Sequence, residues 1–353
     1  MEKLLTIVIP AYNMEKYLHR CLDSIITEKV MDKVQVLVVN DGSKDRTSEI
    51  AHEYETKYPH YIHVIDKENG NYGSCMNAGL AAANGKYFRS LDADDWFDTN
   101  NYEKFVDELE RTDADMLLGD RYEFYEETKE IKHIGFSSDV TRFHEDLPMT
   151  KENWDFKNFF LLSMVWGLTY KTSILRESGL KWDEGVFYTD NEFDFWPLKL
   201  VKTIRLIPIP VYVYLLGREG QTVHPKIQKR NFNSYVIVSN TMVDELLKIY
   251  DDNSDIHEVQ LRFVRRAVNK VFERLLSFDF DEKDAVNSLI AKLEQNNNIY
   301  NYFISTQTFH GTSYLGAYQH NVFLLFFLRT RFLCEKKRYQ LVTNKTIRKI
   351  FGK

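Results

Sequence analysis

The sequence has few cysteines and no long apolar run. Its three cysteines, Cys21, Cys75 and Cys334, form no C-x-x-C pair, which argues against a structural zinc site and is typical of a reducing cytoplasm. The longest late apolar run covers residues 322–328, well short of the ~18 residues that a membrane-spanning helix needs. The first apolar run is interrupted by Pro10 with no small-residue cleavage site after it, so no signal peptide is expected. We therefore expect a cytoplasmic protein that does not cross a membrane.

Two glycine-rich phosphate-binding motifs are also missing. Without G-x-G-x-x-G a dinucleotide site is not supported, and without G-x-x-x-x-G-K-[ST] there is no P-loop. The composition is otherwise ordinary, with 44% hydrophobic and 28% charged residues among 353 and a mean hydropathy of −0.41. These values exclude a disordered or collagen-like chain. At ~150 residues per domain, the length predicts two domains or one large domain with an appendage.

The net charge of −6 is unevenly distributed. Residues 321–353 carry nine Lys or Arg against Glu335 alone, a net charge of +8, which leaves −14 for the rest of the chain. The acidic bulk argues against nucleic acid as a partner. The basic tail adjoins the apolar run, a combination that favours contact with an anionic membrane surface. A homodimer interface is the alternative for this tail.

Short β-branched runs alternate with helical stretches in the first third of the chain. Strands that are continuously apolar and separated by helices are typical of a parallel sheet covered on both faces. We therefore predict a doubly wound α/β unit, whose ligands bind beyond the carboxyl ends of the strands. The expected strands are 4–10, 34–40, 61–66 and the segment leading into the acidic residues at 92–95, and the expected helices are 14–27, 47–58 and 74–83.

The pattern changes further along the chain. Residues 119–230 mix short strands, including VYVYLLG at 211–217, with aromatic-rich stretches that could complete the sheet and close over the site. After residue 231 the reading is mainly helical, because residues 234–250 and 258–276 place apolar side chains at spacings of three and four. A domain boundary is therefore expected near residues 225–230.

An acidic cluster, Asp92-Ala93-Asp94-Asp95, follows the fourth expected strand. Carboxylates two residues apart can turn toward one hard cation, which prefers oxygen ligands and bridges phosphate oxygens. A solvated acidic turn is the alternative, and for an isolated D-x-D it would be favoured. The position at the carboxyl end of an apolar strand favours the ligand-binding interpretation.

A second polar cluster, Asn40-Asp41-Gly42-Ser43, directly follows the second expected strand. Asp41 could accept hydrogen bonds from a ribose or from a base N–H, and Gly42 allows the chain to turn sharply. The alternative is a plain strand-to-helix turn with Asp45 or Thr47 as the helix cap.

The succession TIVIPAYN, VLVVNDGSKDRT and ENGNYGSCMNAGLAAANGKYFRSLDADD resembles the nucleotide-sugar-binding half of family 2 glycosyltransferases with the GT-A fold. The resemblance covers residues 4–100 and, more loosely, 160–224. It implies an α/β fold with a Rossmann-like, mostly parallel sheet flanked by helices. It also implies a catalytic domain at 1–228, with a nucleotide-sugar half (1–100) and an acceptor half (101–228), followed by a helical region at 229–353 with the basic tail.

The resemblance implies a donor site and a metal site. Asp94 would hold Mn²⁺ or Mg²⁺, helped by Asp92 and more weakly by His224, since a lone histidine is more often a surface residue. Met76 stands where the family often has Arg, which removes one phosphate or helix contact. The residues implied in nucleotide-sugar binding are Pro10, Ala11, Tyr12, Asn13, Asp41, Asn71, Ser74, Asn77, Asp92, Ala93 and Arg218.

The segment FYTDNEF at 187–193 matches the catalytic region of the family. Asp190 corresponds to the general base that takes the proton of the acceptor hydroxyl. Thr189 occupies the usual Glu position, so Glu192 is a rival base. A plain helix start is the alternative reading of this segment. Trp166 and Tyr188 are expected on the acceptor side, although core packing is an equal alternative for Trp166.

The resemblance therefore implies an inverting transferase that uses a nucleotide diphosphate sugar, a UDP-hexose or UDP-N-acetylhexosamine. The acceptor would be a lipid-linked or protein-linked glycan in the synthesis of capsule, cell wall or another polysaccharide, with the protein peripheral at the inner face of the membrane. A non-catalytic glycan-binding or nucleotide-sugar-binding module is one alternative. A nucleotidyltransferase is the other, although the expected glycine-rich basic loop after the first strand is missing from PAYNMEKY.

Overall fold

The computed structural model describes residues 3–218, 220–250, 255–278 and 283–305. The chain divides into two compact units, Met1–Thr222 with Ile249–Phe263, and Val223–Lys248 with Val264–Lys353. Within the described ranges, no helix combines the length and the apolar character needed to cross a membrane. The basic tail predicted to contact a membrane, at 321–353, lies outside the described residues.

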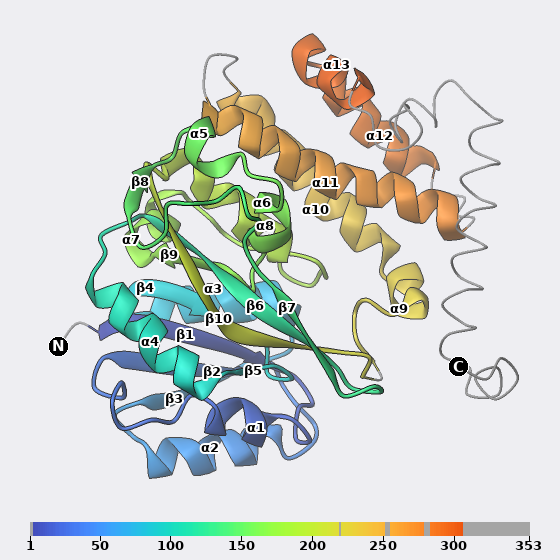
Figure 1. The fold of residues 1–353 in the computed structure, drawn as a ribbon. Coiled ribbons are helices and arrows are strands. Elements are labelled where there is room, and N and C mark those ends of the chain that lie inside the picture. The colour runs from blue at the N-terminus through green and yellow to red at the C-terminus, as the bar shows by residue number, and fades with distance from the viewer. Residues whose placement is uncertain (1–2, 219, 251–254, 279–282, 306–353) are drawn as a thin grey trace, which may run out of the picture. The chain divides into compact units, whose positions relative to one another are not determined.

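The first half of the large unit is the predicted parallel sheet. Its four strands pair side by side in the order β3-β2-β1-β4, and all three pairings are parallel. Helices follow β1, β2 and β3, as the alternating pattern predicts (Figure 1). The elements are β1 (Lys3–Ala11), α1 (Leu18–Asp23), β2 (Val34–Asn40), α2 (Thr47–Lys57), β3 (Ile62–Asp66), α3 (Asn71–Ala82) and β4 (Gly85–Ser90).

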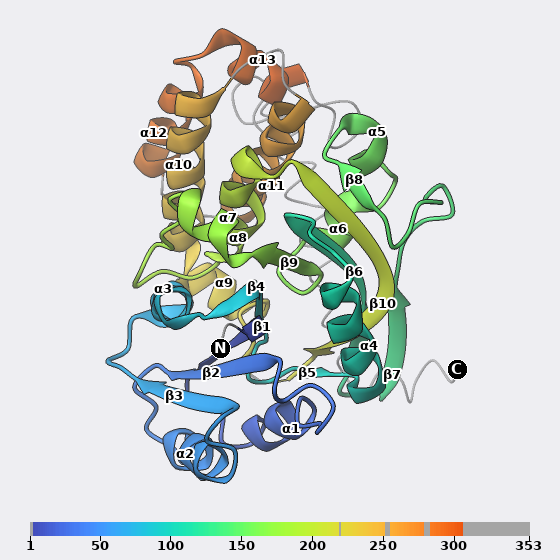
Figure 2. The same ribbon diagram turned by 90° about the vertical axis from the view of Figure 1, so that its left-hand side faces the viewer.

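Both faces of this sheet are covered. Alternate residues of β1, such as Leu5 and Ile7, belong to the core that includes buried residues of α1 and α2. Val8 points the other way, toward Gly79 of α3, where an added Cβ would lie 2.5 Å from Val8 Cγ1. In Figure 2, α3 lies above β2 and β3, while α1 and α2 lie below them. The continuous apolar runs of the sequence therefore reflect burial from two sides.

The second half of the sheet is mixed in direction. β9 pairs antiparallel with both β4 and β6, whereas β6 and β10 are parallel. The order continues β4-β9-β6-β10-β5, with β7 against β6 and β8 against β10. The fold class predicted from the sequence is confirmed, and the pairings are all parallel only in the first half of the sheet. The elements are β5 (Trp96–Phe97), α4 (Thr99–Glu110), β6 (Met116–Tyr125), β7 (Glu130–Ile134), β8 (Asp146–Pro148), α5 (Lys151–Trp154), α6 (Phe159–Leu162), β9 (Leu168–Lys171), α7 (Thr172–Glu177), α8 (Asp190–Phe195), a 3-10 helix (Trp196–Leu200) and β10 (Thr203–Leu216).

The parallel strands bring distant polar loops to one edge of the sheet. The last residue of β1, Ala11, is in register with Asn40 at the end of β2, and Val8 is in register with Ser90 at the end of β4. The loops that begin at Tyr12, Asp41 and Leu91 therefore leave the sheet at the same edge. This edge is where ligands bind in open α/β sheets.

The small unit is helical in its described part. Its helices are α9 (Pro225–Arg230), most of α10 (Phe232–Ile249), the later part of α11 (Asp255–Phe278), α12 (Lys283–Leu293) and α13 (Asn297–Ser305). The Lys292 ammonium forms an ion pair with Asp244 at 2.6 Å and joins α12 to α10. The predicted helices at 234–250 and 258–276 correspond to α10 and α11 within a few residues.

Candidate active site

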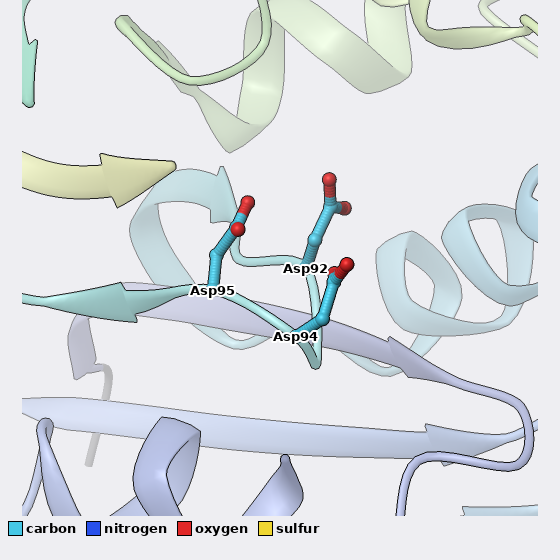
Figure 3. Close-up of side chains that lie close together, drawn as sticks. All are labelled: Asp92, Asp94 and Asp95. Atoms are coloured by element: carbon cyan, nitrogen blue, oxygen red, sulfur yellow. The ribbon is translucent and has the colours of Figure 1, made fainter. Parts of the chain in front are cut away.

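The acidic turn after β4 brings three carboxylates together (Figure 3). One oxygen each from Asp92, Asp94 and Asp95 lies within 4.8 Å of the others. The turn is closed by a hydrogen bond from the Asp95 N–H to the Asp92 carbonyl, at 2.9 Å. The sequence predicts this juxtaposition, because both members of the D-x-D follow a buried strand directly.

Asp95 is anchored to β10 and differs in this respect from the other two. Its Oδ2 accepts a hydrogen bond from the Tyr212 hydroxyl at 2.6 Å, and its Oδ1 accepts one from the Leu215 N–H at 2.7 Å. The side chain is fully buried. Both oxygens of Asp95 are therefore engaged within the fold, and Asp92 and Asp94 are the better candidates for holding a cation.

The acidic turn concentrates negative charge in a buried place. The pKa of Asp92 is raised to about 7, first by burial and then by the neighbouring carboxylates of Asp94 and Asp190, while Arg218 opposes the rise. A buried carboxyl beside a second carboxylate is suited to a divalent cation, which would offset the negative charge of the pair. The oxygen-only donor set fits Mg²⁺ or Mn²⁺.

Two arginines contact Asp94. Arg218, in the loop after β10, forms an ion pair with the Asp94 carboxylate through Nε. Arg20, on α1, donates from Nη2 to the Asp94 carbonyl at 2.7 Å and lies 3.9 Å from the centre of the Trp96 ring. The family resemblance implies Arg218, but Arg20 belongs to no motif and was missed. Its only sequence signal is a basic residue on the first helix after the first polar loop.

Asp190 and Glu192, the two rival bases, have different surroundings. Asp190 begins α8, is partly exposed, and is close enough to Asp92 to affect the pKa of that carboxyl. Glu192 is fully buried, and its Oε2 accepts a hydrogen bond from the Asp183 N–H at 3.0 Å. Burial, followed by the charge of Asp183, raises the pKa of Glu192 to about 9. Glu192 is therefore protonated at neutral pH and is unsuited to accept a proton.

The loop before α8 is fixed on α3, which joins β3 and β4 in the parallel half of the sheet. The Asn77 amide donates to the Trp182 carbonyl and to Glu184 Oε1, both at 2.9 Å, and its oxygen accepts from the Trp182 N–H at 3.0 Å. An added Cβ at Gly73 would lie 2.2 Å from the Asp183 carbonyl oxygen. Asn77 was expected to bind the nucleotide-sugar donor, but its amide nitrogen and oxygen form hydrogen bonds that position this loop. Met76, at the position of the family's arginine, is fully buried.

Asp41 is the centre of a second cluster. Its Oδ1 accepts from Lys67 Nζ at 2.8 Å and from the Gly70 N–H at 2.9 Å, and its Oδ2 accepts from the Asn69 amide at 3.0 Å. Lys67 also donates to Ser74 Oγ at 2.7 Å. Lys67 and Asn69 were not predicted, although both directly follow β3. Asp41 therefore orders the segment after β3 as well as lining the edge of the sheet.

The loop after β1 and the start of α3 flank this cluster. Tyr12 is 45% exposed, unusual for an aromatic side chain at a strand end, while Pro10 is partly buried and Ala11 fully so. Asn13 has a left-handed backbone with φ of 55°, and its Oδ1 accepts from the Lys44 N–H at 2.8 Å. At the start of α3, Asn71 is also left-handed, and its carbonyl accepts from Ser74 Oγ at 3.0 Å.

The remaining predicted residues are spread out. Trp166 stacks on Tyr214 with ring centroids 4.3 Å apart, so one face of its indole is covered. Tyr188 has a left-handed backbone with φ of 67°, and its hydroxyl donates to the Thr222 carbonyl at 3.2 Å. Ala93 is buried inside the acidic turn. His224 belongs to the small unit, where its Nδ1 accepts from the Lys226 N–H at the start of α9.

The fold and the site together define a class of protein. A parallel half-sheet ends in an acidic turn at the carboxyl edge of β4, and a second carboxylate, Asp190, stands at the start of a helix in the mixed half. This arrangement is a GT-A fold. Its fold is similar to that of S. aureus TarS residues 1–349, solved in complex with UDP-GlcNAc, with a TM-score of 0.60, 18% identity, and coverage of 86% of this chain and 84% of that one.

Sequence comparison gives the family. The family described as Glycosyl transferase family 2 matches residues 6–169. The uncharacterized glycosyltransferase MG025 of Mycoplasma genitalium is 30% identical over 204 residues, which cover 55% of this chain and 67% of that protein. Glycosyltransferase GlyA of Streptococcus pneumoniae serotype 4 is 33% identical over 218 residues, 61% of this chain but only 31% of GlyA. The chain belongs to glycosyl transferase family 2, as the resemblance predicts.

Proposed function

We propose that this protein is a metal-dependent, inverting glycosyltransferase that moves a sugar from a UDP-sugar to a hydroxyl of a glycan. The observation that carries the proposal is that Asp92 and Asp94, in the turn after β4, lie near Asp190, at the start of α8. Asp94 and Asp190 both raise the pKa of Asp92, so both lie within electrostatic reach of this carboxyl. A metal-binding pair beside a carboxylate base is what a single displacement at the anomeric carbon requires.

Asp92 and Asp94 are the residues that would hold Mn²⁺ or Mg²⁺. A bound cation offsets the negative charge that grows on the leaving diphosphate. Arg218 contributes from the loop after β10, where a planar guanidinium can pair with two phosphate oxygens. Arg20, on α1, would help to position the proposed cation site, because its guanidinium donates a hydrogen bond to the Asp94 carbonyl. His224 stays a weaker expectation, since its Nδ1 already accepts a backbone hydrogen bond.

Asp190 would take the proton of the acceptor hydroxyl as this hydroxyl attacks the anomeric carbon. One displacement inverts the anomeric centre and needs one base. Glu192 is assigned a different part, because it is buried and its pKa is about 9. It holds the Asp183 N–H and so fixes the loop that leads into Asp190.

The donor is proposed as a UDP-hexose or UDP-N-acetylhexosamine, which would reach from the Asp41 cluster to the acidic turn. Tyr12, exposed at the edge of the sheet, is available to stack on the base. The structures of TarS with UDP-GlcNAc and with UDP support a uridine nucleotide, since they share the fold.

The acceptor is proposed as a glycan hydroxyl in the synthesis of capsule, cell wall or another surface polysaccharide. A lipid-linked glycan suits the basic and apolar tail at 321–353, which would place the enzyme on the inner face of the membrane. Trp166 and Tyr188 would form part of the acceptor side. A protein-linked glycan, with the tail in a homodimer interface, is the competing proposal.

Thermal unfolding with nucleotides tests the donor proposal. UDP, GDP, CDP and dTDP are each added with Mn²⁺ and with EDTA, because a ligand that binds only the folded state raises the unfolding temperature. We expect stabilisation by UDP that requires Mn²⁺ and disappears in Asp94→Ala. Asp107→Ala, an exposed aspartate on α4, is the matched control. No shift with any nucleotide would overturn the proposal in favour of a glycan-binding module, and a preference for another nucleotide would overturn the uridine assignment.

A further inference from the structure

One hydroxyl group joins the two ends of the acidic turn. Tyr212 Oη accepts a hydrogen bond from the Asp92 N–H at 3.1 Å and donates one to Asp95 Oδ2 at 2.6 Å. Tyr212 is 1% exposed and comes from β10, 120 residues from Asp92. We call this pair of hydrogen bonds the Tyr212 bridge.

The bridge is held rigidly from the side of β10. Tyr212 is in antiparallel register with Phe97 of β5, and the two rings pack edge to face with centroids 5.8 Å apart. Three residues further along β10, the Leu215 N–H donates to the other oxygen of Asp95. The strand therefore fixes the backbone of Asp92 and both carboxylate oxygens of Asp95. These two residues flank Ala93 and Asp94 in the acidic turn.

We propose that Tyr212 is a positioning residue that sets the direction of the Asp92 and Asp94 carboxylates for the divalent cation. The proposal rests on the proposed function, because it assigns the cation to these two carboxylates. The hydroxyl acts through the turn and touches neither donor nor acceptor. Without it the Asp92 N–H and the Asp95 carboxylate each lose a buried partner, and the turn can relax away from the geometry that a cation needs.

Removing the hydroxyl alone tests this role. Groups that orient metal ligands typically change metal affinity about 10–100-fold when they are lost. We therefore expect Tyr212→Phe to bind Mn²⁺ at least about tenfold more weakly, measured by electron paramagnetic resonance with Mn²⁺ alone and with saturating UDP. In EDTA, UDP should stabilise neither Tyr212→Phe nor the unmodified protein, because UDP binding is proposed to require the cation.

Tyr87→Phe is the matched control. Tyr87 is a fully buried tyrosine on β4, and its hydroxyl donates to the Thr112 carbonyl at 3.0 Å, a group that Lys86 also contacts. Its loss removes one buried hydroxyl away from the acidic turn. We expect a comparable fall in unfolding temperature in both variants, with weaker Mn²⁺ binding in Tyr212→Phe alone.

The outcomes separate this inference from the proposed function. If the unmodified protein binds Mn²⁺ and Tyr212→Phe binds it equally well, the positioning role is wrong and the proposed function stands. If the unmodified protein binds neither Mn²⁺ nor UDP, both are overturned. Should Tyr212→Phe fail to fold, Asp95→Asn removes the acceptor of the bridge and keeps an oxygen for Leu215. Unchanged Mn²⁺ affinity in Asp95→Asn would then overturn the inference.

Discussion

Arg218 forms an ion pair with Asp94, and both side chains are largely buried, at 14% and 11% exposure. The guanidinium therefore occupies an oxygen of the carboxylate that we propose for the cation. A cation and Arg218 must compete for Asp94, and a cation that wins would release the guanidinium for the diphosphate of the donor. Loss of Arg218 should then have opposite effects on the two ligands.

Arg218→Met is expected to strengthen the binding of Mn²⁺ alone and to weaken the binding of UDP in the presence of Mn²⁺. Hydrogen bonds to charged groups contribute about 1.5–3 kcal/mol, so each affinity should change about 10- to 100-fold. Isothermal titration with each ligand measures both affinities. Arg142→Met, which removes an exposed arginine paired with Glu145, is the control. Parallel changes in the two affinities would show that Arg218 and the cation do not compete.

Two variants distinguish Asp190 from Glu192 as the catalytic base. Asp190→Asn removes the proposed base and should lower kcat by about 10²–10⁴-fold, the usual contribution of a positioned base. Glu192→Gln replaces a carboxyl that is already neutral at pH 7 and keeps an oxygen for the Asp183 N–H. Its kcat should stay within about threefold of the unmodified enzyme.

Transfer of a UDP-sugar to a glycan acceptor, followed by release of UDP, measures both variants. Circular dichroism and Mn²⁺ affinity serve as controls for the fold and for the acidic turn. A large loss in Glu192→Gln together with full turnover in Asp190→Asn would transfer the role of base to Glu192.

The sequence predicts the parts of the site that depend on strand ends. The run VQVLVVN predicts a strand at 34–40, and β2 has these bounds. Asp41 and Asp92 then reach one edge of the sheet because the carboxyl ends of parallel strands coincide. The order of the motifs also predicts the glycosyltransferase family, and the sequence comparison confirms this prediction.

The contacts made by single side chains could not be predicted in this way. Asn77 was expected to bind the donor, but its amide forms hydrogen bonds with the loop at 182–184. This loop is more than 100 residues away in the sequence. Asp95 and Tyr212 meet through the pairing of β5 with β10, for which the sequence holds no local signal. The buried direction of Glu192 depends on how α8 packs, and a helix start fits either direction.

The basic tail provides a prediction from the sequence alone. Each Lys or Arg near an anionic membrane surface contributes about 1 kcal/mol. Replacing Lys336, Lys337 and Arg338 with Ser should therefore weaken sedimentation with phosphatidylserine vesicles about 100-fold in partition coefficient. Vesicles of neutral phosphatidylcholine are the control. If the variant sediments as the unmodified protein does, the tail has another role, such as a homodimer interface.

Glu192 also makes a prediction about stability and pH. Its pKa is about 9 in the folded protein, against an ordinary value of 4.5. Between these values the folded protein keeps a proton that the unfolded chain has lost. The contribution of Glu192 to the free energy of unfolding is therefore fully present below pH 4.5 and falls as the pH rises, until it levels off near pH 9.

Glu192→Gln removes this dependence, because an amide does not titrate. The free energy of unfolding of the variant, minus that of the unmodified protein, should rise with pH between 5 and 8 by about 1.4 kcal/mol per pH unit. Urea unfolding at each pH measures the difference, with Glu28→Gln, at an exposed glutamate, as the control. A difference that stays constant over this range would mean that Glu192 ionises in the folded protein, which would restore it as a rival to Asp190 for the role of base.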